Sequence, residues 1–323
     1  MESALGPRIV AIGNALMDIF AFAAPELPSS FGFKPYSVSH LEGGLEPILR
    51  SIEGATMEAG GGAANMARAS SLLGLDSLFV GTVGDDELGR RYCLDLAAAG
   101  TATSLSISSS PTGVYLVLIH PDDRRTILVA PGAAPQVAKE RMDFPRRAGD
   151  ILYIDGFALA SGSLLEEEGE RAKSAHMVVA IDLGSTHLVE SRREYLLEAI
   201  PRYCDFVFAN EHEFGVLVED SLEGGCKRLA DVPCTFVVKR AERGAAHCRG
   251  GLRIESPVRA QKPFDATGAG DSFAAGFLAG YVHGFTPERC LRFGNRLAEE
   301  VLGVPGLAFD AKKIRLVKAA AGF

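Results

Sequence analysis

Short runs of β-branched and apolar residues alternate with longer amphipathic stretches along most of this chain. This alternation restricts the possible folds more than any other feature of the sequence. The apolar runs predict strands and the amphipathic stretches predict helices. Alternating elements need crossover connections, so we expect an α/β fold with a doubly wound, mostly parallel sheet and helices on both faces. Strands are expected at Arg8–Gly13, Leu78–Val83, Ile151–Asp155, Met177–Asp182, Phe206–Ala209 and Thr235–Lys239, and helices at Asn65–Leu73, Leu88–Ala99, Leu164–Ala175, Glu190–Ile200 and Asn210–Val218.

Two segments interrupt this alternation, Ala21–Gly44 and Thr103–Ala130. Within the second, Gly113–His120 and Arg125–Ala130 predict a hairpin around a Pro-Asp-Asp turn. The two segments can meet as a small accessory sheet, a lid over the edge of the main sheet. A length of 323 residues allows two domains or one large α/β domain with an insertion. We predict one domain over residues 1–323, with lid segments at about 16–44 and 101–132.

Composition and charge exclude several classes of protein. There are 33 Lys and Arg residues against 41 Asp and Glu, a formal net charge of −8, whereas nucleic-acid binders carry a basic excess. The amino terminus lacks the pattern of a secretory signal, and the longest apolar stretch, Ser272–Val282, is too short to span a bilayer. We expect a cytoplasmic protein with neither a nucleic-acid nor a membrane partner. Its six cysteines include no Cys-x-x-Cys pair, so we expect buried, reduced thiols.

The most informative stretch runs from Asp265 to Phe277, where small residues lead directly into an apolar helix. Gly268 and Gly270 allow a tight turn whose N–H groups stay free at the positive end of the helix dipole, which suits a phosphate or a developing anion. A carboxylate beside an anion site is electrostatically unfavourable. Asp271 therefore indicates a proton acceptor next to a transferring group. In the alternative interpretation, Asp271 caps the helix and the glycines serve packing.

This stretch resembles the signature of the ribokinase-like (PfkB) family of carbohydrate and nucleoside kinases, normally D-T-x-G-A-G-D, with Ala266 in place of Thr. The resemblance extends over nearly the whole chain and implies the family's doubly wound fold with a small β lid. It implies that Asp271 deprotonates the acceptor hydroxyl. It also implies that the N–H groups of Gly268, Ala269 and Gly270 stabilise the γ-phosphoryl group transferred from ATP.

A second glycine cluster, Gly60 to Asn65, precedes a predicted helix. Bare backbone at Gly61 and Gly62 lets a polyhydroxy ligand approach, and Asn65 offers a donor and an acceptor to its hydroxyls. A helix start with glycines kept for packing is the alternative. The cluster resembles the family's sugar-holding G-G-x-x-x-N element, although ribokinases often carry Lys at the position of Gly62.

The first predicted strand is followed by Gly13 and Asn14, and Asp18 lies four residues further on. This G-N-x-x-x-D opening is similar to that of adenosine kinases, in which the corresponding Asp accepts hydrogen bonds from two acceptor hydroxyls. The resemblance thus implies that Asn14 and Asp18 bind the acceptor together with Gly61, Gly62 and Asn65.

Nucleotide-side elements follow later strands. Asn210 and Glu213 match the family's N-x-x-E element, which places Asn210 near the phosphates and Glu213 beside hydrated Mg²⁺. A plain helix N-cap explains both residues equally well. Gly244 belongs to a turn that resembles the family's adenine-bordering L-G-x-x-G, with Ala241 in place of its first Gly, and Asn295 matches an Asn near the adenine.

Two further residues, Asp265 and Thr267, occupy positions where many family members bind a monovalent cation, typically K⁺. No Gly in the chain is followed by Lys, which excludes a Walker-type P-loop.

We therefore expect an ATP- and Mg²⁺-dependent kinase that phosphorylates a hydroxymethyl group of a sugar or nucleoside. The Asn14–Asp18 opening and Tyr153–Phe157 look most like the adenosine-kinase branch. The alternatives are another PfkB sugar kinase, acting on ribose, fructose or 2-keto-3-deoxygluconate, and a non-catalytic sensor on the same fold. A lid edge can be covered by a partner lid or left free, so a homodimer through the lid and a monomer both stay open.

Overall fold

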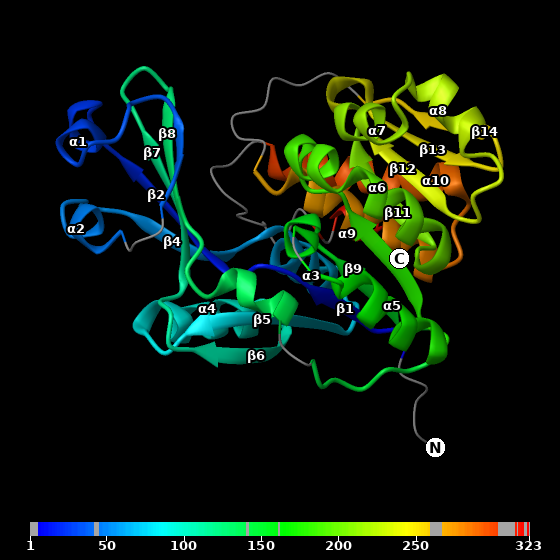
Figure 1. Ribbon diagram of the computed structural model, residues 1–323, viewed down its shortest axis with the longest axis horizontal. Coiled ribbons are helices and arrows are strands. Elements are labelled where there is room, and N and C mark those ends of the chain that lie inside the picture. The colour runs from blue at the N-terminus through cyan, green and yellow to red at the C-terminus, as the bar shows by residue number, and fades with distance from the viewer. Residues whose placement is uncertain are drawn as a thin grey trace.

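The chain forms two sheets that stand side by side (Figure 1). The computed structural model describes residues 6–41, 45–139, 142–160, 162–258, 267–302, 314, 316–319 and 322. Within them, a nine-stranded sheet with helices on both faces makes up the larger part of the molecule, and a five-stranded sheet projects from one end of it. No helix of this described part is long and apolar enough to cross a membrane.

The large sheet is parallel from β12 through β6, and its last two strands, β13 and β14, pair antiparallel. This confirms the doubly wound, mostly parallel sheet predicted from the alternation. In spatial order the strands are β14 (Leu252–Ser256), β13 (Ala245–Arg249), β12 (Thr235–Lys239), β11 (Phe206–Asn210), β10 (Val178–Asp182), β9 (Ile151–Ile154), β1 (Ile9–Ile12), β5 (Ser77–Gly84) and β6 (Ala102–Ser108).

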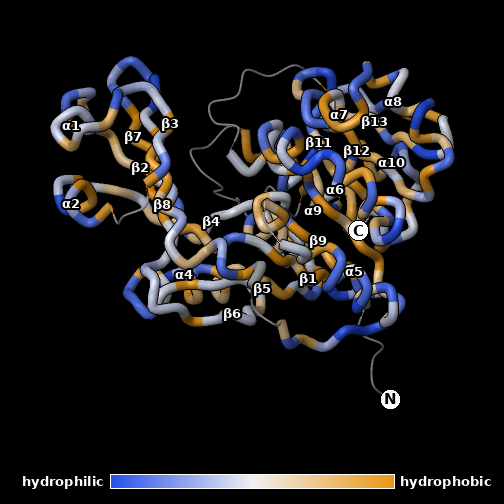
Figure 2. Tube along the Cα trace, viewed as in Figure 1, coloured by the Kyte–Doolittle hydropathy of each residue, from blue (hydrophilic) through white to orange (hydrophobic). Residues whose placement is uncertain are grey.

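Helices cover the two faces of the large sheet because successive strand residues point to opposite sides. In β1, Ile9 and Ala11 belong to one hydrophobic cluster and Val10 and Ile12 to the other, and all four are fully buried. The hydrophobic segments follow the strands and α9 through the interior (Figure 2). One cluster includes α3 (Gly62–Leu72), α4 (Glu87–Ala98), α9 (Ala269–Val282) and α10 (Pro287–Val301), and the other α5 (Leu164–Ser174), α6 (Thr186–Tyr203), α7 (Glu211–Val218) and α8 (Leu222–Arg228).

The direction of winding reverses at β1. From β1 the chain proceeds to β5 and β6 on one side, whereas β9, β10, β11 and β12 succeed one another on the other side. In open α/β sheets, ligands bind outside the carboxyl ends of the strands at such a reversal. The loops that follow β1 and β9 are therefore the place to look for a site.

The small sheet has the order β3 (Val38–His40), β8 (Arg125–Ala130), β7 (Gly113–Ile119), β2 (Leu16–Phe22) and β4 (Thr56–Gly60). The predicted hairpin is confirmed, since β7 and β8 pair antiparallel. Two short helices, α1 (Glu26–Ser30) and α2 (Glu46–Leu49), flank this sheet (Figure 1).

The predicted bounds of the lid were wrong in two places. Strand β6 pairs with β5 along its whole length and so closes the edge of the large sheet, although it lies inside the segment expected in the lid. Strand β4 belongs to the small sheet and lies outside both predicted segments. Both errors concern strand pairing, which a single strand's residues do not specify.

The expectation of six reduced thiols is also wrong, because Cys226 and Cys248 form a disulfide. The bond joins α8 to β13, and the two Cα atoms are 5.5 Å apart although 22 positions separate the residues in sequence. Packing of α8 beside the antiparallel end of the sheet brings the cysteines together. The remaining four cysteines are free: Cys93, Cys204, Cys234 and Cys290.

Candidate active site

Polar residues end four neighbouring strands of the large sheet at its carboxyl edge. Asp155 follows β9, Asp182 is the last residue of β10, Asn210 of β11 and Lys239 of β12. Parallel strands bring these ends to the same edge of the sheet. The first turn of α9, with the residues predicted as an anion hole, packs against this edge, since the side chain of Lys239 contacts Gly270.

Asp271 lies in the first turn of α9, which begins at Ala269 after Gly268. Gly268 has a φ of 71°, a left-handed conformation that favours glycine, and it turns the chain into the helix. The first N–H groups of a helix have no partner within it. The structure thus places Asp271 in the helical turn whose N–H groups are predicted to form the anion hole.

A hydrogen bond connects Asp271 to the acceptor-side residues. The Asn65 Nδ2 donates to Asp271 Oδ2 over 3.0 Å, joining the first turns of α3 and α9. Burial raises the pKa of Asp271 to about 6, the Asn65 hydrogen bond opposes this, and Asp182 and Lys239 act in opposite directions. A carboxyl group with this pKa is ionised at neutral pH and can still take up a proton.

Close backbone approach explains the second glycine cluster. Gly61 has a φ of 94°, and a Cβ atom there would lie 2.1 Å from the carbonyl oxygen of Asn14. A Cβ atom at Gly62 would lie 3.3 Å from Asp155 Oδ2 and from Asp271 Oδ1. Gly62 therefore leaves free the space between two carboxyl groups.

Asp18 is brought to the same region by the small sheet. It lies in β2, pairs with Glu58 of β4 in register, and its side chain is buried. A Cβ atom at Gly60 would lie 2.1 Å from Asp18 Cγ, so the carboxyl group rests against the glycine turn itself. The structure thus gathers Asn14, Asp18, Gly61, Gly62 and Asn65 around one turn, with Asn65 in contact with Asp271.

Asp155 is a site residue that the sequence analysis did not single out. It is 4% exposed, and its Oδ1 accepts a hydrogen bond from the Phe157 N–H over 3.2 Å. Within the described part of the chain, its Oδ2 has no partner at hydrogen-bonding geometry, although the nearby Ala63 N–H helps to stabilise the charge. Burial, and next the charge of Asp271, raise the pKa of Asp155 to about 7. Its position directly after a strand was the only available signal.

Lys239 and Asp182 were missed as well. The Lys239 Nζ donates to Asp182 Oδ2 over 2.6 Å, and both side chains are largely buried. Burial disfavours the charged ammonium, but the carboxylates of Asp182, Glu213 and Asp271 outweigh it and raise the pKa of Lys239. Both residues end a strand, which is again the signal that was available.

Asn210 and Glu213 form a reciprocal capping box at the start of α7. The Glu213 N–H donates to Asn210 Oδ1, and the Asn210 N–H and Nδ2 donate to the two carboxylate oxygens of Glu213, all within 2.8 Å. Burial raises the pKa of Glu213, and the charge of Asp182 adds to this effect. Asn210 and Glu213 thus cap the helix, as the N-cap interpretation predicts. Each carboxylate oxygen of Glu213 still has a further lone pair.

Gly244 and Asn295 converge on Ser256. Asn295 is buried and its Nδ2 donates to the Ser256 carbonyl oxygen over 2.9 Å, while a Cβ atom at Gly244 would lie 2.0 Å from that same oxygen. Ala241, where the family has Gly, adopts a left-handed φ of 49°. The turn of residues 241–244 therefore keeps the backbone conformation that a glycine would favour.

Several site predictions concern a metal. Among the described residues, no group of three His, Cys, Asp or Glu side chains is arranged to hold a metal ion. Thr267 is partly buried just before Gly268, whereas its predicted K⁺-binding partner Asp265 lies outside the described residues.

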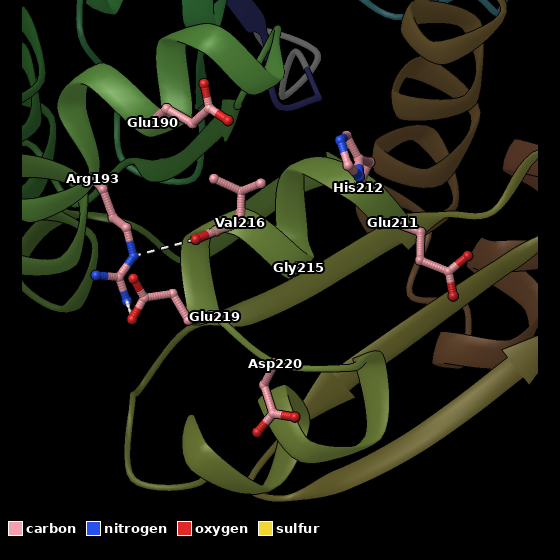
Figure 3. Close-up of a pocket in the computed structure, with 8 residues that line it drawn as sticks. All are labelled: Glu190, Arg193, Glu211, His212, Gly215, Val216, Glu219 and Asp220. Atoms are coloured by element: carbon pink, nitrogen blue, oxygen red, sulfur yellow. Dashed lines mark hydrogen bonds and ion pairs between the residues drawn. The ribbon is translucent and has the colours of Figure 1, made fainter.

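Two hollows on the surface do not coincide with this site. One of about 460 Å³ lies between α6 and α7, where Arg193 pairs with Glu219 over 3.0 Å (Figure 3). The other, of about 570 Å³, lies between α2, the small sheet and α4. Neither is lined by Asp271, Asn65 or Asp18.

The chain is similar to known proteins over most of its length. The model of the pfkB family carbohydrate kinases matches residues 30–314. The ATP-dependent ribose-1-phosphate kinase of Halopiger xanaduensis is 29% identical over 260 residues, covering 79% of this chain and 84% of that protein. The nucleoside kinase of Methanothermobacter thermautotrophicus is 28% identical over 247 residues, covering 75% and 78%.

A solved structure is similar to nearly the whole of this chain. The crystal structure of adenosine kinase from Sinorhizobium meliloti matches with a TM-score of 0.84 and 26% sequence identity, covering 98% of this chain and 100% of that chain. The family match extends over most of the chain and includes the α9 turn and every strand of the small sheet except β2, which precedes residue 30. This chain belongs to the pfkB family of carbohydrate kinases, and it is a kinase of sugars or nucleosides.

Proposed function

We propose that this kinase transfers the γ-phosphoryl group of ATP to the hydroxymethyl group of a ribosyl nucleoside, with adenosine as the first candidate. The observation that carries the proposal is the Asn65–Asp271 hydrogen bond, which joins the polar turn at α3 to the free N–H groups that begin α9. A carboxylate at this junction can serve as a general base between an acceptor hydroxyl and a bound phosphate.

On the acceptor side, Asp18 and Asn65 hold the sugar hydroxyls against the bare backbone of Gly61 and Gly62, and Asn14 completes the turn. Asn65 Oδ1 and Asn14 Oδ1 are buried acceptors without a partner in the described structure, so a ligand hydroxyl can satisfy each. The small sheet, which carries Asp18, covers the acceptor and excludes water that would otherwise hydrolyse ATP.

In the chemical step, Asp271 takes the proton of the acceptor hydroxyl. The hydroxyl oxygen forms a bond to the γ-phosphorus as the bond from that phosphorus to the bridging oxygen breaks, and ADP leaves with the bonding electrons. The N–H groups of Gly268, Ala269 and Gly270 stabilise the negative charge on the transferring group. Asp271 then returns its proton to solvent when the product departs.

On the nucleotide side, Asn210 lies near the phosphates, and Gly244 and Asn295 border the adenine. Bound Mg²⁺, held by water beside Glu213, supplies charge neutralisation to the phosphates. Asp265 and Thr267 bind K⁺ next to the anion hole. Equal activity in KCl and in a salt of a large inert cation would reject the K⁺ site.

The choice of a nucleoside over a bare sugar is supported by the fold and identity shared with an adenosine kinase and by the nucleoside kinase relative. Gly62 stands where ribokinases often carry Lys, which also weighs against ribose. Other sugar acceptors are the second candidate, because a ribose-1-phosphate kinase is equally similar in sequence. A non-catalytic sensor is disfavoured by the intact turn from Gly268 to Asp271.

The small sheet also offers a surface for a homodimer. Phe22 and Val38 are 77% and 59% exposed on its strands, and a partner lid would cover such apolar residues. Sedimentation equilibrium should then give a dimer that Phe22→Asp dissociates. A wild-type monomer would reject this assembly.

A coupled ATP-consumption assay tests the proposed activity. It is run with Mg²⁺ and K⁺ on adenosine, inosine, cytidine, ribose, fructose, fructose 6-phosphate and 2-keto-3-deoxygluconate. We expect adenosine to be phosphorylated well above the ATPase background. Phosphorylation of a bare sugar instead of adenosine would support the sugar-kinase alternative. ATP binding without phosphorylation of any acceptor in the panel would support the non-catalytic sensor.

A further inference from the structure

Lys239 is a largely buried cation at the edge of the proposed site, and neither the general base nor the anion hole accounts for it. It ends β12, its side chain is 18% exposed, and among the described residues its Nζ bonds to one acceptor, Asp182 Oδ2, over 2.6 Å. An ammonium group has three N–H donors. Two of them therefore remain for other acceptors.

The side chain of Lys239 passes over the first turn of α9. A Cβ atom at Gly270 would lie 3.2 Å from Nζ, 3.7 Å from Cδ and 3.8 Å from Cε. The ammonium is thus adjacent to the N–H groups of the predicted anion hole and one residue from Asp271. A side chain at position 270 would push the ammonium away from that turn.

Negative charge gathers around the Lys239 ammonium. Asp182, Glu213 and Asp271 all act on Lys239, and each is a carboxylate in or beside the site. A triphosphate brought among them adds further negative charge, and an unpaired charge in a buried place is costly. Helix N–H groups supply only partial positive charge. Mg²⁺ neutralises part of this charge, and Lys239 is placed where it can supply a further full positive charge at the start of α9.

We propose that Lys239, oriented by Asp182, binds the γ-phosphoryl group of ATP at the start of α9 and stays bound to it during transfer. This inference rests on the proposed function, and it adds a residue that the family signature in this chain does not include. Asp182 orients the Lys239 ammonium through their hydrogen bond and is a positioning residue. The N–H groups of α9 and the ammonium together then surround the transferring phosphoryl oxygens.

The plain alternative is a structural ion pair, and the chain contains a matched control for it. Lys173 in α5 donates to Asp205 Oδ2 over 2.7 Å, so it forms a similar Lys–Asp pair away from the proposed site. Lys239→Met and Lys173→Met each remove one such ammonium and keep an apolar stem. Lys239→Arg keeps the charge.

The experiment is isothermal titration of the full chain and its variants with the non-hydrolysable β,γ-imido analogue of ATP, with ADP and with AMP, all with Mg²⁺. We expect Lys239→Met to weaken binding of the ATP analogue about tenfold to a hundredfold. AMP binding should change less than about twofold, and Lys239→Arg should recover most of the affinity for the analogue. Lys173→Met should bind all three nucleotides like the wild type.

Unchanged binding of the ATP analogue by Lys239→Met would overturn the assignment. So would equal losses for the analogue and AMP, which would indicate a structural role, and equal losses for the analogue and ADP, which would place the contact on the β-phosphate. If Lys239→Met does not fold, Asp182→Asn/Lys239→Met, which leaves no unpaired carboxylate, is titrated in its place. A wild type that binds no nucleotide would reject the proposed function itself, and this inference with it.

Discussion

Burial adapts the carboxyl group of Asp271 to the proton transfer that we propose for it. Its pKa is raised to about 6 by burial, with Asn65 and Lys239 opposing the rise. The ionised form is the one that accepts a proton from the acceptor. Because the group is protonated below that pKa, the base is lost as the pH falls.

We therefore expect kcat/KM to fall about tenfold per pH unit below pH 6 and to be level from about pH 7 to pH 8. Initial rates across this range with saturating ATP check it. Nucleotide binding is measured at the same pH values, so that titration of ATP itself is not mistaken for titration of Asp271. A profile that is flat from pH 5 to pH 8 would contradict the assignment.

The buried carboxylate of Asp155, in contrast, lowers the stability of the folded protein. Its folded-state pKa of about 7 lies above the value of 3.8 for an unperturbed Asp, so the folded state holds a proton that the unfolded chain releases. The penalty is absent below the unfolded pKa, grows as the pH rises between the two values, and is complete above the folded pKa. Well above pH 7, the folded protein bears the full cost of this buried charge.

Asp155→Asn should remove the penalty while its amide oxygen still accepts from the Phe157 N–H. We expect the free energy of unfolding to rise at pH 8 by on the order of 2–4 kcal/mol and the difference to vanish near pH 4. Urea unfolding at the two pH values measures it. A variant less stable than the wild type at pH 8 would show that the carboxylate is stabilised by contacts that outweigh its burial.

At the scale of elements, Cys226 and Cys248 tie α8 to the antiparallel end of the large sheet. A bond that closes a loop of this length restricts the unfolded chain, which stabilises the folded state by about 3 kcal/mol. We expect a reducing agent to lower the melting temperature of the wild type. The double variant Cys226→Ala/Cys248→Ala should melt at one temperature with and without reductant, and a wild type insensitive to reductant would contradict the prediction.

Element positions were largely predictable, and their pairing was not. The apolar runs located β1, β5, β9, β10, β11 and β12 to within a residue or so because these strands are largely buried on both faces and are mostly apolar. Strand β6 was assigned to the wrong sheet, since Ala102–Ser108 is partly exposed and polar in sequence. The sheet to which such a strand belongs depends on its hydrogen-bonded neighbour, here β5, which lies elsewhere in the chain.

The residues of the candidate site also differ in how far the sequence predicts them. Asp271, Gly268 and Asn65 were recognisable because they occur within short runs of unusual residues. Asp155 and Lys239 are single polar residues at the ends of ordinary strands, and only the assembled sheet brings them together. The disulfide was missed for the same reason, because its partners lie on elements that meet only in the folded chain.

In the whole molecule, the site depends on two sheets and two helices. Asp18 comes from the small sheet, Asp155 and Lys239 from the carboxyl edge of the large one, and Asn65 and Asp271 from the first turns of α3 and α9. The reversal of winding at β1 opens the place where these elements meet. Asp271 thus lies between the acceptor side and the phosphate side that we propose for this site.

The central claim is that Asp271 is the base in this assembly, and Asp271→Asn tests it most directly. The amide keeps the shape of the side chain and can still bond to Asn65. With the acceptor found in the panel, we expect kcat to fall about a hundredfold to ten-thousandfold while the affinity for the imido analogue of ATP stays within about twofold. Near-normal turnover by the variant, with ATP bound as in the wild type, would contradict the account.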